Sequence, residues 1–257
     1  MTAIYKKELR SYFINPIGYV FVGIFLTISS LLCSYTTIQS GSYNTQTYFT
    51  VMVFVLAIFV PILTMRSFAE EKKTKTDQLL LTSPISITAM VAGKFLAVLT
   101  VSVGAFLVTL VNLIPLSVIG ISERSGESYS ARHIGLVPAK VFGCIIGVIL
   151  ICTAFAAIGL FVSSLTENQL TAAITSIGII AFLIAISFLN MIGKDSEGTR
   201  LIGNAFIRGV IDWVSVLSRF SSFSSGKLAV ADVLYYLSLS FIFLMLCVRV
   251  FDKKRYA

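Results

Sequence analysis

Residues 141–165 read VFGCIIGVILICTAFAAIGLFVSSL, a run without a single charged residue. About 20 consecutive apolar residues are enough for a helix to cross the hydrocarbon core of a bilayer. We therefore predict a membrane-spanning helix here. Five further apolar runs lie on either side of it in the sequence. They occupy residues 17–35, 49–65, 95–119, 170–190 and 233–250.

The composition of the whole chain agrees with a membrane protein. Of its 257 residues, 56% are hydrophobic and 12% are charged, and the mean hydropathy is +0.92. A soluble domain carries about 25% charged residues, so this chain has too few to cover its surface in water. The predicted fold class is all-α: a polytopic membrane protein with six transmembrane helices in a single domain over residues 1–257.

The net charge of +8 comes from basic residues that flank the apolar runs. Basic residues anchor membrane proteins at such places, so the charge does not indicate nucleic-acid binding. The four cysteines each fall inside an apolar run and form no CxxC pair, and they are Cys33, Cys144, Cys152 and Cys247. We therefore expect buried thiols rather than disulfides or a metal site.

An amphipathic interface helix is predicted ahead of the first span, over residues 1–15. Its apolar and basic residues separate at helical spacing. The apolar residues are Tyr5, Leu9, Tyr12 and Phe13, and the basic residues are Lys6, Lys7 and Arg10. Such a helix suits the membrane surface, and Asn15-Pro16 ends it because the residue before proline avoids the helical region. No A-x-A cleavage site follows the first apolar run, so we predict an uncleaved span.

The segments between the spans are polar or mixed. Residues 66–94 form a charged loop and residues 121–138 a polar one. Thr166 and Gln169 match a capping box that would start the fifth span, and Asp232 is the predicted N-cap of the sixth. Residues 191–231 combine charges with apolar residues at helical spacing, which predicts an extracytoplasmic loop with short helices at the outer leaflet.

The distribution of lysine and arginine predicts the orientation. The side that would carry both termini and residues 66–94 holds the majority of the 20 lysines and arginines. Loops rich in these residues stay in the cytoplasm. We therefore predict cytoplasmic termini and a cytoplasmic loop after the second span.

Several classes of function are disfavoured by what the spans and loops lack. The interior of the six predicted spans contains no charged residue and no histidine, whereas proton- and sodium-driven carriers usually place such groups there. The sequence contains no G-x-x-x-x-G-K-[ST], H-E-x-x-H or G-x-S-x-G motif. Its single histidine, His133, lies in a predicted outside loop. We therefore predict that the chain is not an enzyme and binds no cofactor or metal itself.

Residues 66–84 read RSFAEEKKTKTDQLLLTSP, charged in the first half and apolar just before a proline. A short helix across the cytoplasmic face would present Leu79, Leu80 and Leu81 to a groove on a partner and end at Pro84. The same residues would equally form a solvated basic loop that anchors the flanking spans. The residue pattern alone leaves both interpretations open.

Motifs along essentially the whole chain point to one family. They are SFAEEKKT (67–74), LLLTSP (79–84), Gly93-Lys94, GLFVSSLTENQ (159–169), FSSG (223–226) and DVLYY (232–236). With them the sequence resembles the membrane permeases of ABC type 2 (ABC-2) transporters, and most of all the short permeases grouped with gliding-motility-associated transporters. It departs from the family at Lys75, a position where relatives often carry glycine.

The resemblance implies a permease subunit of an ATP-binding cassette transporter in the inner (cytoplasmic) membrane. Members of this family are mainly exporters, so export is the expected direction. The permease would pair with a second permease chain as a homo- or heterodimer. A separate ATPase subunit would bind ATP and Mg and dock on a coupling helix within residues 66–84. The docking residues would be Glu70, Glu71, Lys72, Thr74, Asp77, Leu79, Leu80, Leu81, Thr82, Ser83 and Pro84. The interface helix would contribute Tyr5, Lys6, Lys7, Leu9 and Arg10. Phe206, Trp213 and Leu217 would lie in an outer gate, or in an interfacial helix with no gating role.

Gly143 and Gly147 permit close helix packing, either within the chain or between two chains.

The mostly apolar spans favour a lipid, a lipid-linked glycan or an amphipathic peptide as cargo over a small ion. The alternative function is a membrane scaffold or anchor for an extracytoplasmic auxiliary protein, in which the ATPase drives conformational signalling rather than transport. A membrane-embedded enzyme is disfavoured by the missing acid and base groups.

Overall fold

The computed structural model describes residues 2–14, 16–38, 45–76, 86–115, 117, 138–192 and 215–256. Within these ranges the chain forms helices joined by short turns, without any strand. The helices are α1 (Thr2–Ile14), α2 (Pro16–Cys33), α3 (Thr45–Lys73), α5 (Ile87–Thr109), α7 (Pro138–Leu165), α8 (Gln169–Ile192), α10 (Val216–Ser224) and α11 (Val230–Tyr256). A π-helical turn, η1 (Ser34–Ile38), follows α2, and a 3-10 turn, η2 (Leu110–Asn112), follows α5.

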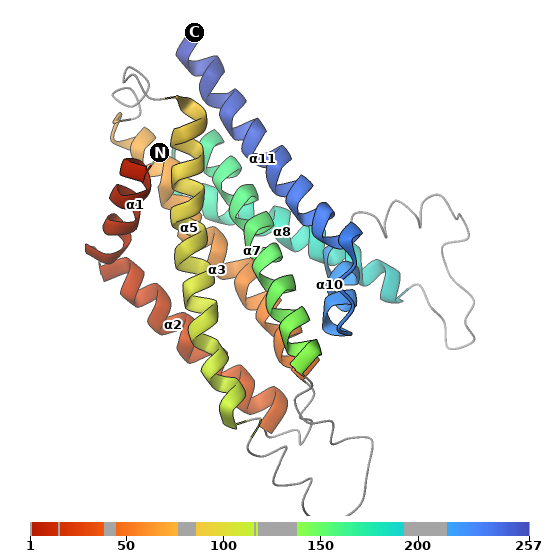
Figure 1. Ribbon diagram of the computed structural model, residues 1–257. Helices are drawn as coiled ribbons and strands as arrows, with labels where there is room; N and C mark the ends of the chain where they lie inside the picture. The colour runs from red at the N-terminus through yellow and green to blue at the C-terminus, as the bar shows by residue number, and fades with distance from the viewer. Residues whose placement is uncertain are drawn as a thin grey trace, which may run out of the picture.

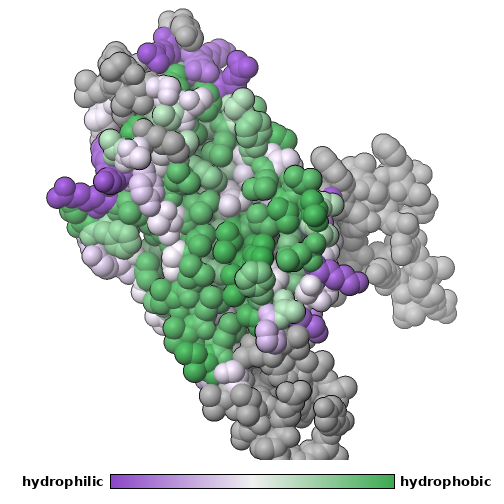
Figure 2. Space-filling model, viewed as in Figure 1, coloured by the Kyte–Doolittle hydropathy of each residue, from purple (hydrophilic) through white to green (hydrophobic). Residues whose placement is uncertain are grey.

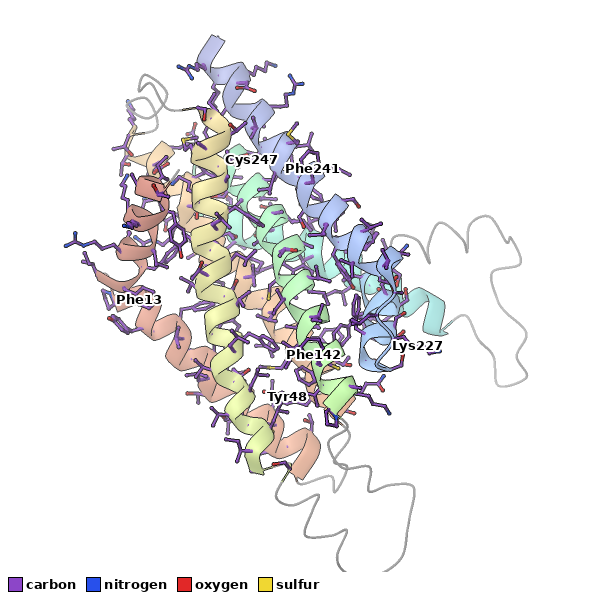
Figure 3. The ribbon with its side chains drawn as sticks, in the orientation of Figure 1. Phe13, Tyr48, Phe142, Lys227, Phe241 and Cys247 are labelled. Atoms are coloured by element: carbon purple, nitrogen blue, oxygen red, sulfur yellow. The ribbon has the colours of Figure 1, made fainter. Side chains whose placement is uncertain are left out.

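Six of the helices are long and apolar enough to cross a membrane. They cover Gly18–Thr36, Gln46–Lys73, Ile87–Pro115, Pro138–Leu165, Gln169–Phe188 and Val230–Arg255. The face shown in Figure 2 is largely apolar between its two ends. Phe241 of α11, for example, is 63% exposed and points away from the bundle (Figure 3). The prediction of an all-α protein with six spans is thus confirmed, and the chain is an integral membrane protein.

The helices on either side of the predicted loop over residues 66–94 are longer than the sequence analysis expects. α3 continues past Met65 to Lys73, and α5 begins at Ile87. Glutamate and lysine are good helix formers, so charge at the end of a span does not end the helix. Residues 77–85, which contain most of the predicted coupling helix, lie outside the described residues.

α7 is the central helix of the bundle and contacts α3, α5, α8, α10 and α11 (Figure 1). It approaches α3 so closely that a Cβ added at Gly159 would overlap the Oγ1 of Thr64. One turn further, the Ser163 hydroxyl accepts a hydrogen bond from the N–H of Phe68 at 3.2 Å and donates one to the carbonyl of Met65 at 3.1 Å. These bonds tie the backbone of α3 to α7.

Both termini lie at the same end of the bundle, together with the end of α3, the start of α5 and the turn between α7 and α8 (Figure 1). We call this the termini end. The opposite end holds the ends of α2 and α5, the starts of α3 and α7, and α10. An even number of spans returns the chain to the side on which it began, which accounts for the common position of the termini.

The last turn of the α5 segment is irregular at the opposite end. The helix tightens into η2 just before Pro115, because proline has no N–H and its ring clashes with the carbonyl four residues earlier. Asn112 lies in this turn and bonds to two hydroxyls of α2. Its Nδ2 donates to Ser29 Oγ at 3.2 Å, and its Oδ1 accepts from Ser30 Oγ at 3.2 Å. The side chain of Asn112 therefore joins α5 to α2.

The predicted capping box at the start of α8 is wrong. The hydroxyl of Thr166 donates backwards to the carbonyl of Val162, at the end of α7. The Oδ1 of Asn168 accepts from the N–H of Leu170 at 3.2 Å, so Asn168 caps α8 instead. The turn between α7 and α8 is too short for Thr166 to leave the end of the first helix and cap the second.

The close approach of α3 and α7 makes Gly159 sensitive to substitution. Gly159→Ala would push a methyl group against Thr64, and we expect a loss of about 1–3 kcal/mol of stability, as overpacking usually causes. Thermal unfolding of the purified protein in detergent measures the loss. Gly104→Ala is the matched control, because nothing lies within 4 Å of a Cβ at that glycine of α5. Equal effects of the two substitutions would contradict the proposed close contact.

Candidate functional site

A buried ammonium group joins three helices at the termini end. Lys94 belongs to α5, and its side chain is 2% exposed. Its Nζ donates to Glu8 Oε1 of α1 at 2.9 Å, to Glu71 Oε1 of α3 at 2.8 Å and to the carbonyl of Ser67 at 2.7 Å. An ammonium group has three N–H donors, so all of them are used. We call Glu8, Glu71 and Lys94 the ion triad.

The ion triad places charges inside two helices that extend beyond the predicted span bounds, 49–65 and 95–119. Lys94 falls inside the candidate span Ile87–Pro115, and Glu71 falls inside Gln46–Lys73. A buried charge is tolerated only when it is paired and hydrogen-bonded, and the carboxylates of Glu8 and Glu71 with the Ser67 carbonyl meet that condition. The arrangement leaves no free donor on Lys94, so it serves as a link between helices rather than as an acid or base.

An aromatic pair connects the ion triad to the last helix. The Nζ of Lys94 lies 5.0 Å from the centroid of the Phe68 ring, a distance at which a cation is attracted to the face of an aromatic ring. The centroids of Phe68 and Phe251 are 4.8 Å apart. Phe251 is a buried residue near the end of α11. The termini end of α11 is therefore packed on the same group of side chains.

Tyrosines add further polar contacts between α1 and the bundle. The hydroxyls of Tyr5 and Thr100 are 3.2 Å apart. Tyr12 Oη donates to the carbonyl of Leu63 at 3.1 Å and lies 3.3 Å from Ser67 Oγ. Burial raises the pKa of the Tyr12 phenol, so the group stays neutral and keeps its donor. The predicted basic residues Lys6, Lys7 and Arg10 are exposed, and Leu9 is half-buried. The polar face of α1 is thus open to solvent or to a partner.

The predicted docking residues that the structure describes lie at the end of α3. Glu70 pairs with Arg66 of the same helix at 2.7 Å. Lys72 is buried, and its Nζ donates to the carbonyl of Ser164 near the end of α7. The hydroxyl of Thr74 donates to the carbonyl of Glu70 at 2.9 Å. Asp77, Leu79, Leu80, Leu81, Thr82, Ser83 and Pro84 lie outside the described residues. Of the docking residues that the structure describes, Glu71 and Lys72 therefore face inward and fix the end of α3.

α3 ends in a Schellman motif with Lys75 in the left-handed conformation, at a φ of 57°. The N–H of Thr76 donates to the carbonyl of Glu71 at 2.9 Å, and that of Lys75 donates to the carbonyl of Lys72 at 3.1 Å. These are the two bonds that define the motif. Glycine is favoured at such a position because it has no Cβ. The chain thus keeps the turn although a lysine occupies the position.

The glycine pair of α7 packs against α10 of the same chain. A Cβ added at Gly143 would lie 2.5 Å from the carbonyl oxygen of Phe223, and one at Gly147 would lie 3.1 Å from the ring of Phe220. Of the two alternatives for these glycines, the structure shows contact within the chain. The absence of side chains at these two positions of α7 lets α10 lie directly on its backbone.

Polar bonds fix both sides of α10. Ser187 Oγ of α8 accepts from the N–H of Leu217 at 3.2 Å, so this predicted gate residue lies at the start of α10. Asp232 is not the N-cap of α11 but lies in its first turn, where it pairs with Arg219 of α10 at 3.0 Å. The guanidinium of Arg219 also lies 4.3 Å from the centroid of the Tyr235 ring. An ion pair to a neighbouring helix thus replaces the local cap. Phe206 and Trp213 lie outside the described residues.

Glu8 and Lys94 are the functional residues that were not predicted as site residues from the sequence. Glu8 lies between Tyr5 and Tyr12 at helical spacing, on the apolar face of α1. A single acid on the apolar face of a basic helix is a signal that the acid has a buried partner. The predicted third span starts at residue 95, which leaves Lys94 as a flanking residue. Extending the span by two turns would have placed a lysine inside it.

The part of the chain that the structure describes offers no group of three or more His, Cys, Asp or Glu side chains that could hold a metal ion. All four cysteines are buried, and none forms a disulfide. The candidate site is therefore a set of links between helices: the ion triad, the buried Lys72 and the turn at Lys75, all at the termini end.

Removal of the lysine from the ion triad should destabilise the protein strongly. Lys94→Met leaves two partly buried carboxylates without a counter-charge. We expect a loss of about 3–5 kcal/mol, which is usual when one partner of a buried ion pair is removed. The triple variant Glu8→Gln/Glu71→Gln/Lys94→Met removes all three charges and should recover most of the loss. Thermal unfolding in detergent distinguishes the variants. An unfolding midpoint for Lys94→Met equal to that of the wild type would contradict the ion triad.

The left-handed turn at the end of α3 predicts a gain of stability from glycine. Lys75→Gly should stabilise the protein by about 1 kcal/mol, because a residue with a Cβ is disfavoured by roughly 1–2 kcal/mol in this conformation. Lys73→Gly, in the last helical turn, should instead destabilise because glycine is a poor helix former. The two unfolding midpoints are compared under one detergent condition. A lower midpoint for Lys75→Gly would show that the turn is not left-handed.

Comparison with known proteins gives one family. A model of the family described as ABC-2 family transporter protein matches residues 29–251. None of the curated proteins compared with the chain matches it. The matched region contains Glu71, Lys94, α10 and nearly all of the sixth span, whereas α1 and Glu8 precede it. Because the match covers most of the chain and the six-helix fold agrees with it, this protein belongs to the ABC-2 transporter family.

Proposed function

We propose that this chain is the permease subunit of an ATP-binding cassette exporter, of the gliding-motility-associated branch, driven by a separate ATPase subunit that docks on residues 66–84. The observation that supports this most is the attachment of that segment to the spans. The end of α3 is held to α5 and α1 by Lys94 and to α7 by Lys72. A push on the segment therefore acts on the spans directly.

The charge of the termini end supports a cytoplasmic position for it. Its exposed basic side chains include Lys73, Lys75, Lys253, Lys254 and Arg255. Lysine and arginine beside spans are retained on the cytoplasmic side, where ATP is available. In this orientation both termini and residues 66–84 face the ATPase, and α10 faces the extracytoplasmic side of the inner membrane.

The proposed mechanism is a two-state rigid-body switch. Two permease chains pair, and each docks one ATPase subunit that binds ATP and Mg. Closure of the ATPases brings the docking segments together, the spans tilt, and a path opens between the two permeases. The permease contributes shape and contact surface and makes or breaks no covalent bond. An extracytoplasmic auxiliary protein would bind at the end that carries α10.

The cargo of this transporter is proposed from the character of the spans. Their polar side chains mostly hydrogen-bond to backbone carbonyls of their own helices, as Thr27, Thr153 and Thr175 do. Few groups are left for the coordination of a small ion. This supports a lipid, a lipid-linked glycan or an amphipathic peptide as the exported cargo.

Docking is tested by substitution in the segment between α3 and α5. Leu79→Asp/Leu81→Asp should weaken the complex with a candidate ATPase subunit by about tenfold or more, since apolar anchors usually dominate such interfaces. Co-purification and a binding titration in detergent give the affinity. Leu228→Asp is the matched control, because Leu228 is 53% exposed at the opposite end. Undiminished binding of the double variant would refute docking at this segment. Full cellular function with a hydrolysis-deficient ATPase would favour the scaffold alternative.

A further inference from the structure

We propose that α1 is a lever: the bond from Glu8 to Lys94 makes α1 move with α3 and α5, and α1 in turn moves the first span, α2. This inference rests on the proposed function, because it concerns how force from the ATPase is distributed. Glu8 is the positioning residue on which it depends. The family model starts at residue 29, after α1, so the lever lies in a part of the chain that the family match does not cover.

α1 is held to the bundle by directional bonds more than by apolar burial. Of its residues only Ile4 and Tyr12 are buried. Its polar contacts come from Tyr5, Glu8 and Tyr12, which follow one another at spacings of three and four along one face. An interface helix that only floats on the membrane needs an apolar face towards lipid. Here that face is turned to the protein and carries an acid and two phenols.

The ion triad fixes the register of α1 in a way that apolar contacts cannot. Apolar side chains can slide past one another with little change in burial, since the hydrophobic effect is non-directional. The Lys94 ammonium has three bonds between 2.7 and 2.9 Å, one to α1 and two to successive turns of α3. A small shift of α1 would leave a buried charge without a full set of partners. α1 therefore follows any displacement of α3 and α5.

The corner between α1 and α2 passes the movement on. A Cβ added at Gly18 would overlap the carbonyl oxygen of Tyr12, so the start of α2 lies directly against the end of α1. The rings of Phe13 and Tyr19 pack edge to face across the same corner, with centroids 5.7 Å apart (Figure 3 labels Phe13). Tyr12 also bonds to α3 through the carbonyl of Leu63. The first span thus starts from a helix that is fixed to the second and third.

The experiment removes the bond between Glu8 and Lys94 and leaves the other bonds of Lys94 in place. Glu8→Ala removes one bond of the triad and leaves Lys94 paired with Glu71, so the core of the fold is retained, whereas Glu8→Gln keeps a side-chain acceptor in place. Spin labels are attached to cysteines introduced at Ile24 of α2 and Phe241 of α11, which are 48% and 63% exposed. Their distance is measured in the complete complex with the ATPase, with and without ATP. The native cysteines are buried, and the parent chain without added cysteines serves as the labelling control.

In the wild type, ATP should change the distance between the two labels. Glu8→Ala should reduce this change by about half or more while the ATPase binds with unchanged affinity, because coupling through a broken link is lost and docking is not. Glu8→Gln should retain most of the change. Asp232→Ala, which breaks the Arg219 pair at the opposite end, should leave the change intact.

Every other result contradicts either the lever or the proposed function. A full distance change in Glu8→Ala would overturn the lever and leave the proposed function standing. Loss of ATPase binding in Glu8→Ala would show that α1 is a docking element and not a lever. A wild-type complex whose label distance does not respond to ATP would overturn the ATP-driven permease itself, and the lever with it.

Discussion

The termini end of this protein depends on one buried ammonium group. Lys94 uses each of its three N–H donors on a different partner, and those partners belong to α1 and to two turns of α3. A charge in such a place is tolerated only with a counter-charge, because the free energy of burying it unpaired is far larger than that of burying a neutral polar group. The positions of three helices are therefore set by one side chain.

The two ends of the bundle are stabilised by different physical means. Ionic and polar bonds dominate the termini end, where Lys94, Lys72 and Tyr12 bind carboxylates and carbonyls of neighbouring helices. At the opposite end, the bare backbone at Gly143 and Gly147 lets α10 lie flat on α7. In between, the close approach of α3 and α7 joins the two regions. For an ABC-2 transporter protein, this places precise, directional contacts at the end proposed to receive force and close steric packing at the other.

The sequence predicts the spans of this protein far better than it predicts their ends. Hydropathy identifies six helices because only an apolar run can be accommodated in lipid. It places the end of the second helix too early, because the charged residues from Arg66 to Lys73 continue the helix beyond the apolar run. Thr166 and Asp232 show a related limit. Each fits a local capping rule, yet one bonds backwards and the other pairs with Arg219, which only the fold brings near. The partner of Glu8 is likewise 86 residues away in the chain.

The order of the ion triad along the chain has a consequence for how the protein is made. Glu8 and Glu71 precede Lys94 by 86 and 23 residues. Synthesis proceeds from the N-terminus, so both carboxylates are already part of the nascent chain when Lys94 is added. A lysine that entered lipid alone would oppose insertion of its helix. Here the counter-ions are synthesised before the lysine that needs them, so the order of the chain favours early pairing over exposure of the lysine alone.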